Sequence, residues 1–475
     1  MWTRRYSFLA FVAARAALAG ADDHTCAAGF VFDVYANGAS ADAVVVSLTG
    51  AQCGTTSQFE AAVSAAACGD VTKCLVRDAA GRRARTCSEL SRYSAEPGVQ
   101  PAGAPRAYAV PRDMRFVYAS EEVGFERRLP HLSMTMTTLA LKPRLFALEN
   151  FLTEDDATRL VEDALAITDE EHKLLPSSTG AKGYTVSAIR TSENAWVKDT
   201  ATASKLKRRA FELLAFDGYD ERMADGVQVL RYNNSNGYVA HKDFLSRPAG
   251  VSAEEMDPSR GGANRLATVF LYLSDVRHGG QTVFPKAPRP ADAAKFPTLE
   301  SRPLDAEVKA LSDALPENAR RWEPKLVEDC YTKLAAAPKK GRAILFYSQH
   351  PDGTLDDYAT HGGCPVLDGQ KWAANLWVWN KPMPFGSSRF GSKDGKDAAS
   401  QKGVDVVFTT GLDGVEILWK GTGGEVTMGG GPAPNQPYTL NSFHGHVFVA
   451  RRRGRFFGEF TVDGKGANRF LVVGD

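Results

Sequence analysis

One short segment, Tyr238-Val239-Ala240-His241-Lys242-Asp243, indicates the fold and the chemistry of this chain. On a β-strand, residues i and i+2 point to the same face, so His241 and Asp243 should project together. One imidazole and one carboxylate provide half of a site for a borderline-hard metal ion. A His-x-Asp triplet is common on protein surfaces, so the assignment depends on the remainder of the chain.

A second imidazole is needed, and His361 in Thr360-His361-Gly362-Gly363-Cys364-Pro365 is the best candidate. Two His and one carboxylate on one side of a metal leave three coordination positions open. A 2-oxo acid can fill two of them and O2 the third, which is the arrangement of non-haem Fe(II) oxygenases. We therefore predict that His241, Asp243 and His361 bind Fe(II).

Lys371 lies ten residues after His361, within the aromatic run Lys371-Trp372-Ala373-Ala374-Asn375-Leu376-Trp377. If His361 and Lys371 lie on adjacent strands, the ammonium can face the metal from deeper in the barrel. There it would pair with the distal carboxylate of 2-oxoglutarate, a pairing that exclusion of water strengthens. Tyr232 and Thr282 can donate hydroxyl hydrogen bonds to the same carboxylate.

Several segments, in this order along the chain, resemble the catalytic domain of prolyl 4-hydroxylases of the collagen, plant and algal type. These segments are Arg231-Tyr232, Tyr238 to Asp243, Gly279 to Pro285, Gly341 to Phe346 and His361 to Trp372. The resemblance spans about residues 143 to 382. It implies a double-stranded β-helix that uses Fe(II), 2-oxoglutarate, O2 and ascorbate to convert proline in a peptide or protein to hydroxyproline, releasing succinate and CO2.

The resemblance also implies roles for individual residues. The positions that match the catalytic iron ligands are His241, Asp243 and His361. The positions that match the 2-oxoglutarate site are Lys371, Tyr232 and Thr282, and those that match the peptide channel are Tyr238, Arg265 and Trp377. Arg190-Thr191-Ser192 matches the start of a substrate loop, and Cys330 and Cys364 match a disulfide present in some members.

The chain has 475 residues, enough for about three domains. Two predicted helices, at about 154–165 and 202–216, precede strands at 227–232, 267–273, 343–347 and 372–379. We predict a mainly β protein with supporting helices and a jelly-roll core. The expected boundaries are a signal peptide (1–19), a Cys-rich module (20–96), a linker and lead-in (97–142), the oxygenase domain (143–382, with an insertion at about 287–325), a linker (383–402) and a β-sandwich (403–475).

The N-terminus predicts export. Arg4 and Arg5 precede an apolar stretch and Ala17-Leu18-Ala19, which suits signal peptidase. The apolar run is too short for a standard membrane span, so no transmembrane segment is expected after cleavage, with a signal anchor as the alternative. Cysteines crowd residues 26–87, as in disulfide-stapled modules. We expect the protein in the endoplasmic reticulum lumen or outside the cell. A formal net charge of +1 gives no case for nucleic acid binding.

Residues 415 to 449 resemble the von Hippel–Lindau β domain, which binds hydroxyproline. Trp419, Ser442 and His446 match its pocket, whereas Phe448 stands where that family has Trp. The hypothesis is a module that reads hydroxyproline, and the alternative is a plain β-sandwich spacer or interaction domain.

Three alternatives to prolyl hydroxylation remain open at this point. A 2-oxoglutarate oxygenase could act on another residue or on a small molecule. A zinc hydrolase could use the same two His and one carboxylate, but it would leave Lys371 and Tyr232 without a role. A non-catalytic binding protein on a degenerate oxygenase scaffold would have lost residues that bind the metal or anchor 2-oxoglutarate. All five residues expected in these two roles (Tyr232, His241, Asp243, His361 and Lys371) are present in this chain.

Overall fold

A computed structural model describes residues 29–68, 74–169, 172–177, 190–198, 200–245, 252–292, 305–315, 323–383, 404–421, 424–427, 431–442, 447–462 and 468–472. The chain divides into two compact units, Met1–Arg247 with Ala253–Ser392, and Pro248–Ser252 with Lys393–Asp475. The predicted signal peptide and Cys26 lie outside the described residues. Within the described ranges, none of the helices has the length and apolar character that crossing a bilayer requires.

The N-terminal module is a four-stranded sheet with helices. Its strands are β1 (Phe30–Ala36), β2 (Val44–Leu48), β3 (Cys74–Arg77) and β4 (Arg106–Pro111), in the order β2-β1-β4-β3. The helices are α1 (Gly50–Cys53), α2 (Thr56–Ala67) and α3 (Cys87–Ser94). Disulfides Cys53–Cys87 and Cys68–Cys74 join these elements around a buried apolar cluster, so the predicted disulfide-stapled module is confirmed.

The prediction that residues 97–142 form a linker and lead-in has to be corrected. This segment contains β4, which pairs with β1 and β3, and two strands of the central sheet, β5 (Glu126–Leu129) and β6 (Met134–Ala140). The Pro- and Gly-rich stretch before β4 masked that strand, whose partner β1 is distant in the sequence. β5 and β6 pair with neighbouring strands.

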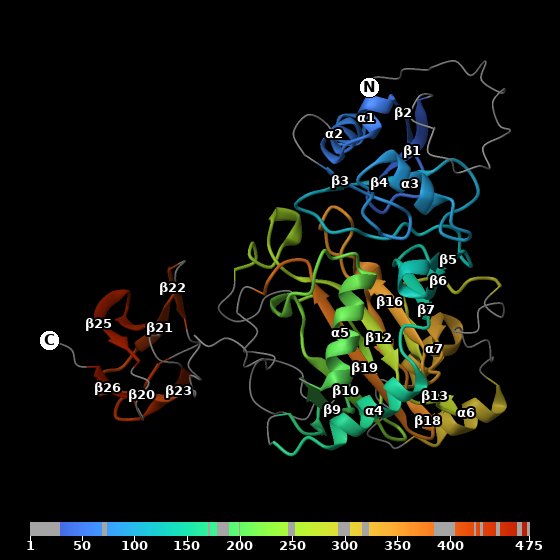
Figure 1. The fold of residues 1–475 in the computed structure, drawn as a ribbon. Helices are drawn as coiled ribbons and strands as arrows, with labels where there is room; N and C mark the ends of the chain where they lie inside the picture. Colours follow the sequence, from blue (N-terminus) through green and yellow to red (C-terminus); the bar gives the residue numbers. More distant parts are fainter. Residues whose placement is uncertain are drawn as a thin grey trace, which may run out of the picture. The chain divides into compact units, whose positions relative to one another are not determined.

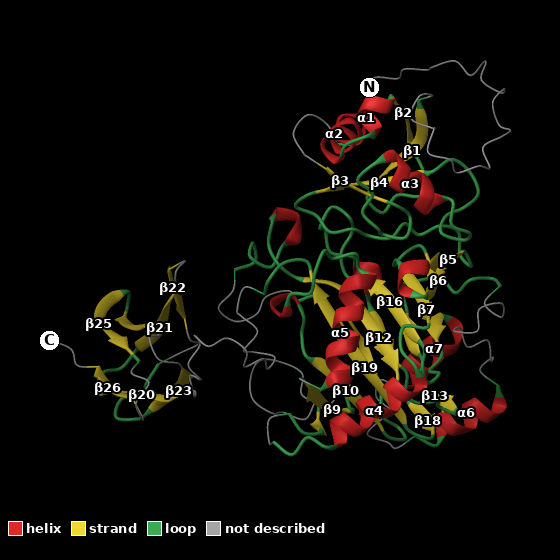
Figure 2. Cartoon of the chain, viewed as in Figure 1, coloured by secondary structure: helices red, strands yellow, loops and turns green. Residues whose placement is uncertain are grey.

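The central sheet has nine strands in the order β5-β6-β7-β16-β12-β19-β10-β9-β8. The members not yet given are β7 (Leu145–Glu149), β8 (Leu175–Pro176), β9 (Glu193–Val197), β10 (Val227–Tyr232), β12 (Arg265–Tyr272), β16 (Ala343–Tyr347) and β19 (Lys371–Trp379). Figures 1 and 2 show α4 (Glu154–Leu165) and α5 (Ala201–Leu213) over one face of this sheet. A capping box begins α4, with Thr153 and Asp156 bonded reciprocally.

A smaller sheet, β11-β17-β14-β15, faces the other side of the central sheet. Its strands are β11 (Tyr238–His241), β14 (Thr282–Phe284), β15 (Leu334–Ala336) and β17 (His361–Gly363), with the pair β13 (His278–Gly279) and β18 (Val366–Asp368) beside it. Side chains from both sheets, including Phe270, Phe284 and Phe346, form one buried cluster. Gly279 has a φ of 80°, and a Cβ there would lie 2.1 Å from the Pro365 carbonyl oxygen. The predicted jelly-roll core is thus observed.

The insertion contributes to packing behind the smaller sheet. It contains α6 (Ala306–Asp313), and α7 (Glu323–Thr332) follows. Val308, Leu315 and Val327 are buried against Val283 and Leu367. The Cys330–Cys364 disulfide, implied by the family resemblance, joins α7 to the segment directly after β17. Single-turn 3-10 helices complete the unit: η1 (Pro130–Leu132), η2 (Glu221–Met223), η3 (Pro258–Arg260) and η5 (Asp357–Ala359).

The C-terminal unit consists of two sheets, ordered β23-β20-β26 and β22-β21-β24-β25. Their strands are β20 (Val404–Thr410), β21 (Val415–Gly421), β22 (Gly424–Thr427), β23 (Tyr438–Ser442), β24 (Val447–Arg452), β25 (Arg455–Thr461) and β26 (Asn468–Val472). Val406, Phe408, Ile417 and Phe448 are among the residues of a core drawn from both sheets. The two sheets and their shared core match the expected small β-sandwich.

Candidate active site

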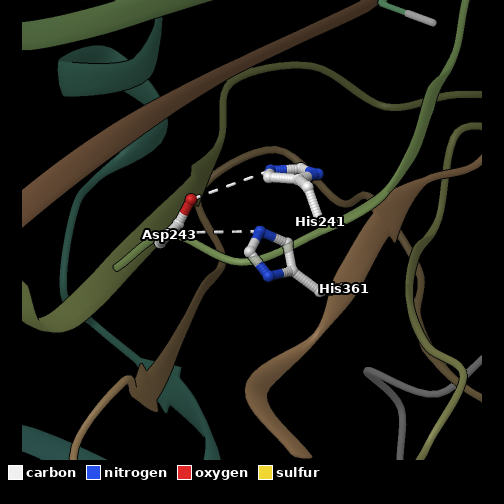
Figure 3. Close-up of side chains that lie close together, drawn as sticks. All are labelled: His241, Asp243 and His361. Carbon is white, nitrogen blue, oxygen red and sulfur yellow. Dashed lines mark ion pairs between the residues drawn. The ribbon is translucent and has the colours of Figure 1, made fainter. Parts of the chain in front are cut away.

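His241, Asp243 and His361 meet on the inner side of the smaller sheet. His241 ends β11 and His361 begins β17, and the two residues are direct partners in the antiparallel register. Asp243 lies two residues beyond His241, just past the strand end, and its carboxylate returns to both imidazoles. One ligand atom from each residue lies within 4.8 Å of the other two. Figure 3 shows the carboxylate facing both rings.

Backbone carbonyls orient the two imidazoles. Nδ1 of His241 donates to the Val239 carbonyl oxygen at 2.9 Å, and Nδ1 of His361 donates to that of Ala359 at 3.0 Å. Both Nε2 atoms are therefore unprotonated in neutral rings, and they lie 3.7 Å and 3.6 Å from the two Asp243 oxygens. Burial lowers the pKa of His241, which keeps its ring neutral and able to bind a metal.

The carboxylate of Asp243 is held in its ionised form. Burial alone would raise its pKa, but the imidazoles of His361 and His241, the Arg265 cation and the Thr268 hydroxyl lower it. Thr268 Oγ1, on β12, donates to Asp243 Oδ2 at 2.7 Å, and Arg265 Nη1 donates to the Asp243 carbonyl oxygen at 3.1 Å. Residues of the central sheet thus position Asp243, a metal-binding residue that follows a strand of the smaller, facing sheet.

This donor set fits the iron that the sequence predicts. Two neutral imidazoles and one carboxylate converge from one side, which is the facial triad preferred by non-haem Fe(II). The hydrogen bonds from Nδ1 and from Thr268 supply the outer support that metal ligands ordinarily have.

Lys371 is buried in an aromatic cage. Its Nζ lies 5.3, 5.2 and 5.6 Å from the ring centroids of Tyr232, Phe270 and Tyr272. Among the described residues, none places a carboxylate within ion-pair distance of this ammonium, and burial lowers its pKa to about 7. A buried, unneutralised cation is costly unless an anion joins it. The cage is therefore suited to a carboxylate brought by a ligand.

His361 and Lys371 do not lie on adjacent strands, the arrangement under which the ammonium was expected to face the metal. His361 begins β17 in the smaller sheet and Lys371 begins β19 in the central sheet, so they face each other across the barrel. The two sheets pack through one core, and this brings the ammonium to the metal side without strand pairing.

The predicted hydroxyl partners lie in the same layer. Tyr232 is opposite Lys371 in the β10–β19 register, and its ring forms one wall of the cage. Thr282 Oγ1 accepts a 2.9 Å hydrogen bond from the Tyr272 hydroxyl, and both residues are buried. Thr282 is thus oriented by Tyr272, which sequence reasoning did not single out.

The predicted peptide-channel residues form a second wall. The Arg265 guanidinium stacks 3.8 Å from the Trp377 ring centroid and forms a 2.7 Å ion pair with Asp225. Tyr238 stacks on His241 at 3.7 Å between ring centroids, with the Arg190 guanidinium 4.9 Å from its ring. All three predicted channel residues are therefore next to the metal cluster or to one another.

Three supporting residues escaped prediction: Thr268, Phe270 and Tyr272. They recur at every second position of β12, and a register shift after Arg265 brings that residue to the same face. The period-2 pattern of an inward face could have found them, but β12 is buried on both faces. Its two faces therefore look alike in sequence.

The binding of hydroxyproline by the C-terminal unit remains a prediction. The side chains of Trp419 and Ser442, and the whole of His446, lie outside the described residues. Phe448 is 1% exposed and packs edge-on against Phe408 in the core of the C-terminal unit. Phe448 therefore serves the core, and any pocket would have to use other walls.

Known proteins resemble this chain over the same region. Residues 227–379 match the 2OG-Fe(II) oxygenase superfamily. "Probable prolyl 4-hydroxylase 4" and "Prolyl 4-hydroxylase 2" of Arabidopsis thaliana are each 32% identical over 243 residues, 50% of this chain and 67% of theirs. A solved viral collagen prolyl hydroxylase from Paramecium bursaria Chlorella virus-1 aligns with 22% identity and a TM-score of 0.31, covering 50% of this chain and 96% of its own. From the superfamily match and the two plant relatives, we conclude that the chain belongs to the prolyl 4-hydroxylases of the 2OG-Fe(II) oxygenase superfamily.

Proposed function

We propose that this protein is an Fe(II)- and 2-oxoglutarate-dependent prolyl 4-hydroxylase. It converts proline in a peptide to hydroxyproline and couples this to the conversion of 2-oxoglutarate and O2 into succinate and CO2. Its relatives among the prolyl 4-hydroxylases support the choice of proline as the substrate side chain.

The observation that carries the proposal is Lys371. Its buried ammonium, in a cage without a carboxylate among the described residues, lies across the barrel from the His-Asp-His cluster. A ligand that binds a metal at one end and offers a carboxylate at the other would satisfy both features. 2-Oxoglutarate has this shape, whereas a zinc hydrolase would leave the ammonium without a partner.

The chain's own residues prepare the site for this ligand. His241 and His361 present unprotonated Nε2 atoms because their Nδ1 protons are committed to backbone carbonyls. Asp243 offers an anionic oxygen while Thr268 holds the other one. Lys371 binds the distal carboxylate, and the apolar barrel around it excludes water. When bound, Fe(II) supplies the O2 activation that the protein side chains cannot provide.

The channel residues hold the substrate beside this centre. Arg265, Trp377 and Tyr238 form a rigid, largely aromatic wall, because Asp225 fixes the guanidinium and His241 supports the tyrosine ring. Aromatic faces bind the apolar edge of a pyrrolidine ring at low entropic cost. Ascorbate is proposed as a reductant that keeps the iron in the ferrous state.

A proline-rich peptide library incubated with Fe(II), 2-oxoglutarate, O2 and ascorbate tests the proposal. We expect peptide-dependent release of succinate and the gain of one oxygen atom on proline, both detected by mass spectrometry. Leaving out ascorbate should shorten the linear phase of turnover. Oxygen on another residue type, or turnover without 2-oxoglutarate, would contradict the assignment.

We further propose that the enzyme works in the endoplasmic reticulum lumen or after secretion. Three disulfides, which persist only in oxidising compartments in most organisms, support this. Mass spectrometry of the protein from its native cell after thiol alkylation would test it. Alkylated Cys53, Cys87, Cys330 and Cys364 would place the protein in a reducing compartment instead.

A further inference from the structure

The inner face of the central sheet carries a layer of amide side chains between the Lys371 cage and the channel wall. Gln228 on β10 and Asn375 on β19 are direct partners in the strand register. Asn375 lies four residues after Lys371 and two before Trp377, so all three point to the same face. The two amides are 5% and 7% exposed. On the other side Asn375 pairs with Phe270 of β12, and Trp377 pairs with Thr268, which holds the metal ligand Asp243.

Arg190 fixes the orientation of both amides. Its guanidinium can only donate hydrogen bonds, so Gln228 must present Oε1 to Arg190 Nη2, which lies 3.2 Å away. The same Oε1 accepts from Asn375 Nδ2 at 3.2 Å. Asn375 must therefore turn its nitrogen toward Gln228 and its oxygen, Oδ1, away from it.

Two polar atoms on this wall have no protein partner. No hydrogen bond reaches Asn375 Oδ1 from any part of the chain that the structure describes. Trp377 Nε1, on a side chain that is 93% buried, also lacks a partner there. Leaving a buried group such as Trp377 Nε1 unpaired costs about 1–3 kcal/mol, so a ligand or water is expected to satisfy it. The pair offers one acceptor and one donor, on residues whose backbone positions are about 6.6 Å apart along the strand.

An acceptor oxygen repels a carboxylate, so Asn375 Oδ1 suits an N–H group and not 2-oxoglutarate. We propose that Asn375 and Trp377 bind the substrate backbone: Trp377 Nε1 donates to a peptide carbonyl, and Asn375 Oδ1 accepts from a peptide N–H. Two residues of a polyproline II chain span about 6.2 Å, close to the backbone spacing of Asn375 and Trp377 along β19. Gln228 is the positioning residue that keeps Asn375 in this orientation.

The inference rests on the proposed function and names its substrate class. Proline has no backbone N–H, so the group that Asn375 accepts from must belong to a residue near the target proline that is not itself proline. The enzyme should therefore prefer isolated prolines with a neighbouring N–H over uninterrupted polyproline.

The test uses peptides with one target proline flanked by glycines, in which each flanking glycine is replaced in turn by sarcosine, its N-methyl analogue. Wild type should show a KM about tenfold higher for one sarcosine position than for the parent peptide, with the KM for 2-oxoglutarate unchanged. In Asn375→Leu that difference should disappear. Anisotropy of a labelled peptide under anaerobic conditions should give the same pattern in dissociation constants.

Variants at Gln228 keep the test decisive if Asn375→Leu folds poorly. Gln228→Glu retains an acceptor for Arg190 and for Asn375, so discrimination against sarcosine should persist. Gln228→Met removes the acceptor and should reduce discrimination to less than threefold. Equal KM values for glycine and sarcosine peptides at every position in wild type would overturn the inference. So would an Asn375→Leu variant that changes only the KM for 2-oxoglutarate. Absence of peptide-dependent succinate release in wild type would instead contradict the proposed function.

Discussion

At the scale of single residues, the hydrogen bond by which Thr268 holds the metal-binding residue Asp243 can be tested directly. Its hydroxyl donates to Asp243 Oδ2, and outer-shell partners of this kind are worth roughly 10–100-fold in metal affinity. We expect Thr268→Val to weaken Fe(II) binding by that factor, whereas Asp243→Ala should abolish both iron binding and 2-oxoglutarate turnover. Anaerobic calorimetric titration measures the affinity. Thr268→Ser keeps the hydroxyl and should stay near wild type, and an unchanged Thr268→Val would show that the bond does not support the ligand.

Lys371 should make 2-oxoglutarate binding depend on pH. Its pKa in the ligand-free protein is lowered to about 7 by burial, and a bound carboxylate would raise it, so binding takes up a proton above pH 7. The KM for 2-oxoglutarate should rise on the order of tenfold between pH 7 and 8.5 and stay flat below pH 7.

The same lysine should make folding stability depend on pH. Between pH 7 and 10.5, Lys371 is protonated in the unfolded chain but not in the folded, ligand-free protein. The free energy of unfolding should therefore rise with pH across that window.

Two variants separate this effect from general pH damage. Lys371→Arg remains charged throughout, so its KM for 2-oxoglutarate should not vary over the same range. Lys371→Ala should raise the 2-oxoglutarate requirement at every pH without loss of iron. A Lys371→Arg profile as steep as wild type would assign the titration to another group.

Site residues were predictable from sequence where their chemistry is distinctive. A His-x-Asp pair, a distant His and a Lys in an aromatic run are unusual in combination. His241, Asp243 and His361 form one cluster, and Lys371 is buried among aromatic rings. Gln228, Asn375 and Thr268 were not predictable, because ordinary residue types acquire their roles only through the register of β10, β12 and β19.

At the scale of elements, the Cys330–Cys364 disulfide links α7 to the residue directly after β17, the strand that carries His361. It closes a loop with a sequence separation of 34, for which chain entropy predicts about 3–4 kcal/mol of stabilisation. Replacing both cysteines with serine should cost about that much in the free energy of unfolding and weaken Fe(II) binding, measured by calorimetry. The Cys68–Cys74 pair, with a separation of 6, is the matched control: its loss should cost about 2 kcal/mol and leave iron affinity unchanged.

Elements with a strong local signal were predicted well, and those that depend on distant partners were not. Residues close together in the sequence determine the capping box of α4 and the apolar strands β10, β16 and β19. By contrast, β4 follows a Pro- and Gly-rich stretch, and its pairing with β1 joins residues far apart in the sequence. β5 and β6 pair with neighbouring strands, and the alternation of Met and Thr in β6 could have revealed that strand.

At the scale of the whole molecule, the N-terminal module is joined to the oxygenase domain through buried polar contacts. Arg127 on β5 is 2% exposed and donates to the carbonyl oxygens of Ala79, Val99 and Ala119. The Tyr118 hydroxyl donates to the Ala80 carbonyl oxygen at 3.1 Å and lies 2.9 Å from that of Leu213 on α5. Both sets of contacts tie the 78–81 turn of the module to the central sheet and its helix, within one compact unit.

These contacts predict joint unfolding. Arg127→Met would leave three buried carbonyl oxygens without their donor, at a cost of roughly 3 kcal/mol, and should lower the melting temperature of the whole unit by several degrees. Arg128→Met, at the neighbouring exposed position, should change nothing. Hydrogen exchange read by mass spectrometry should show residues 30–111 and β10, β12 and β19 losing protection together in Arg127→Met. If only the N-terminal residues lost protection, the module would be an independent appendage, and the arginine would secure its docking without supporting the metal-binding barrel.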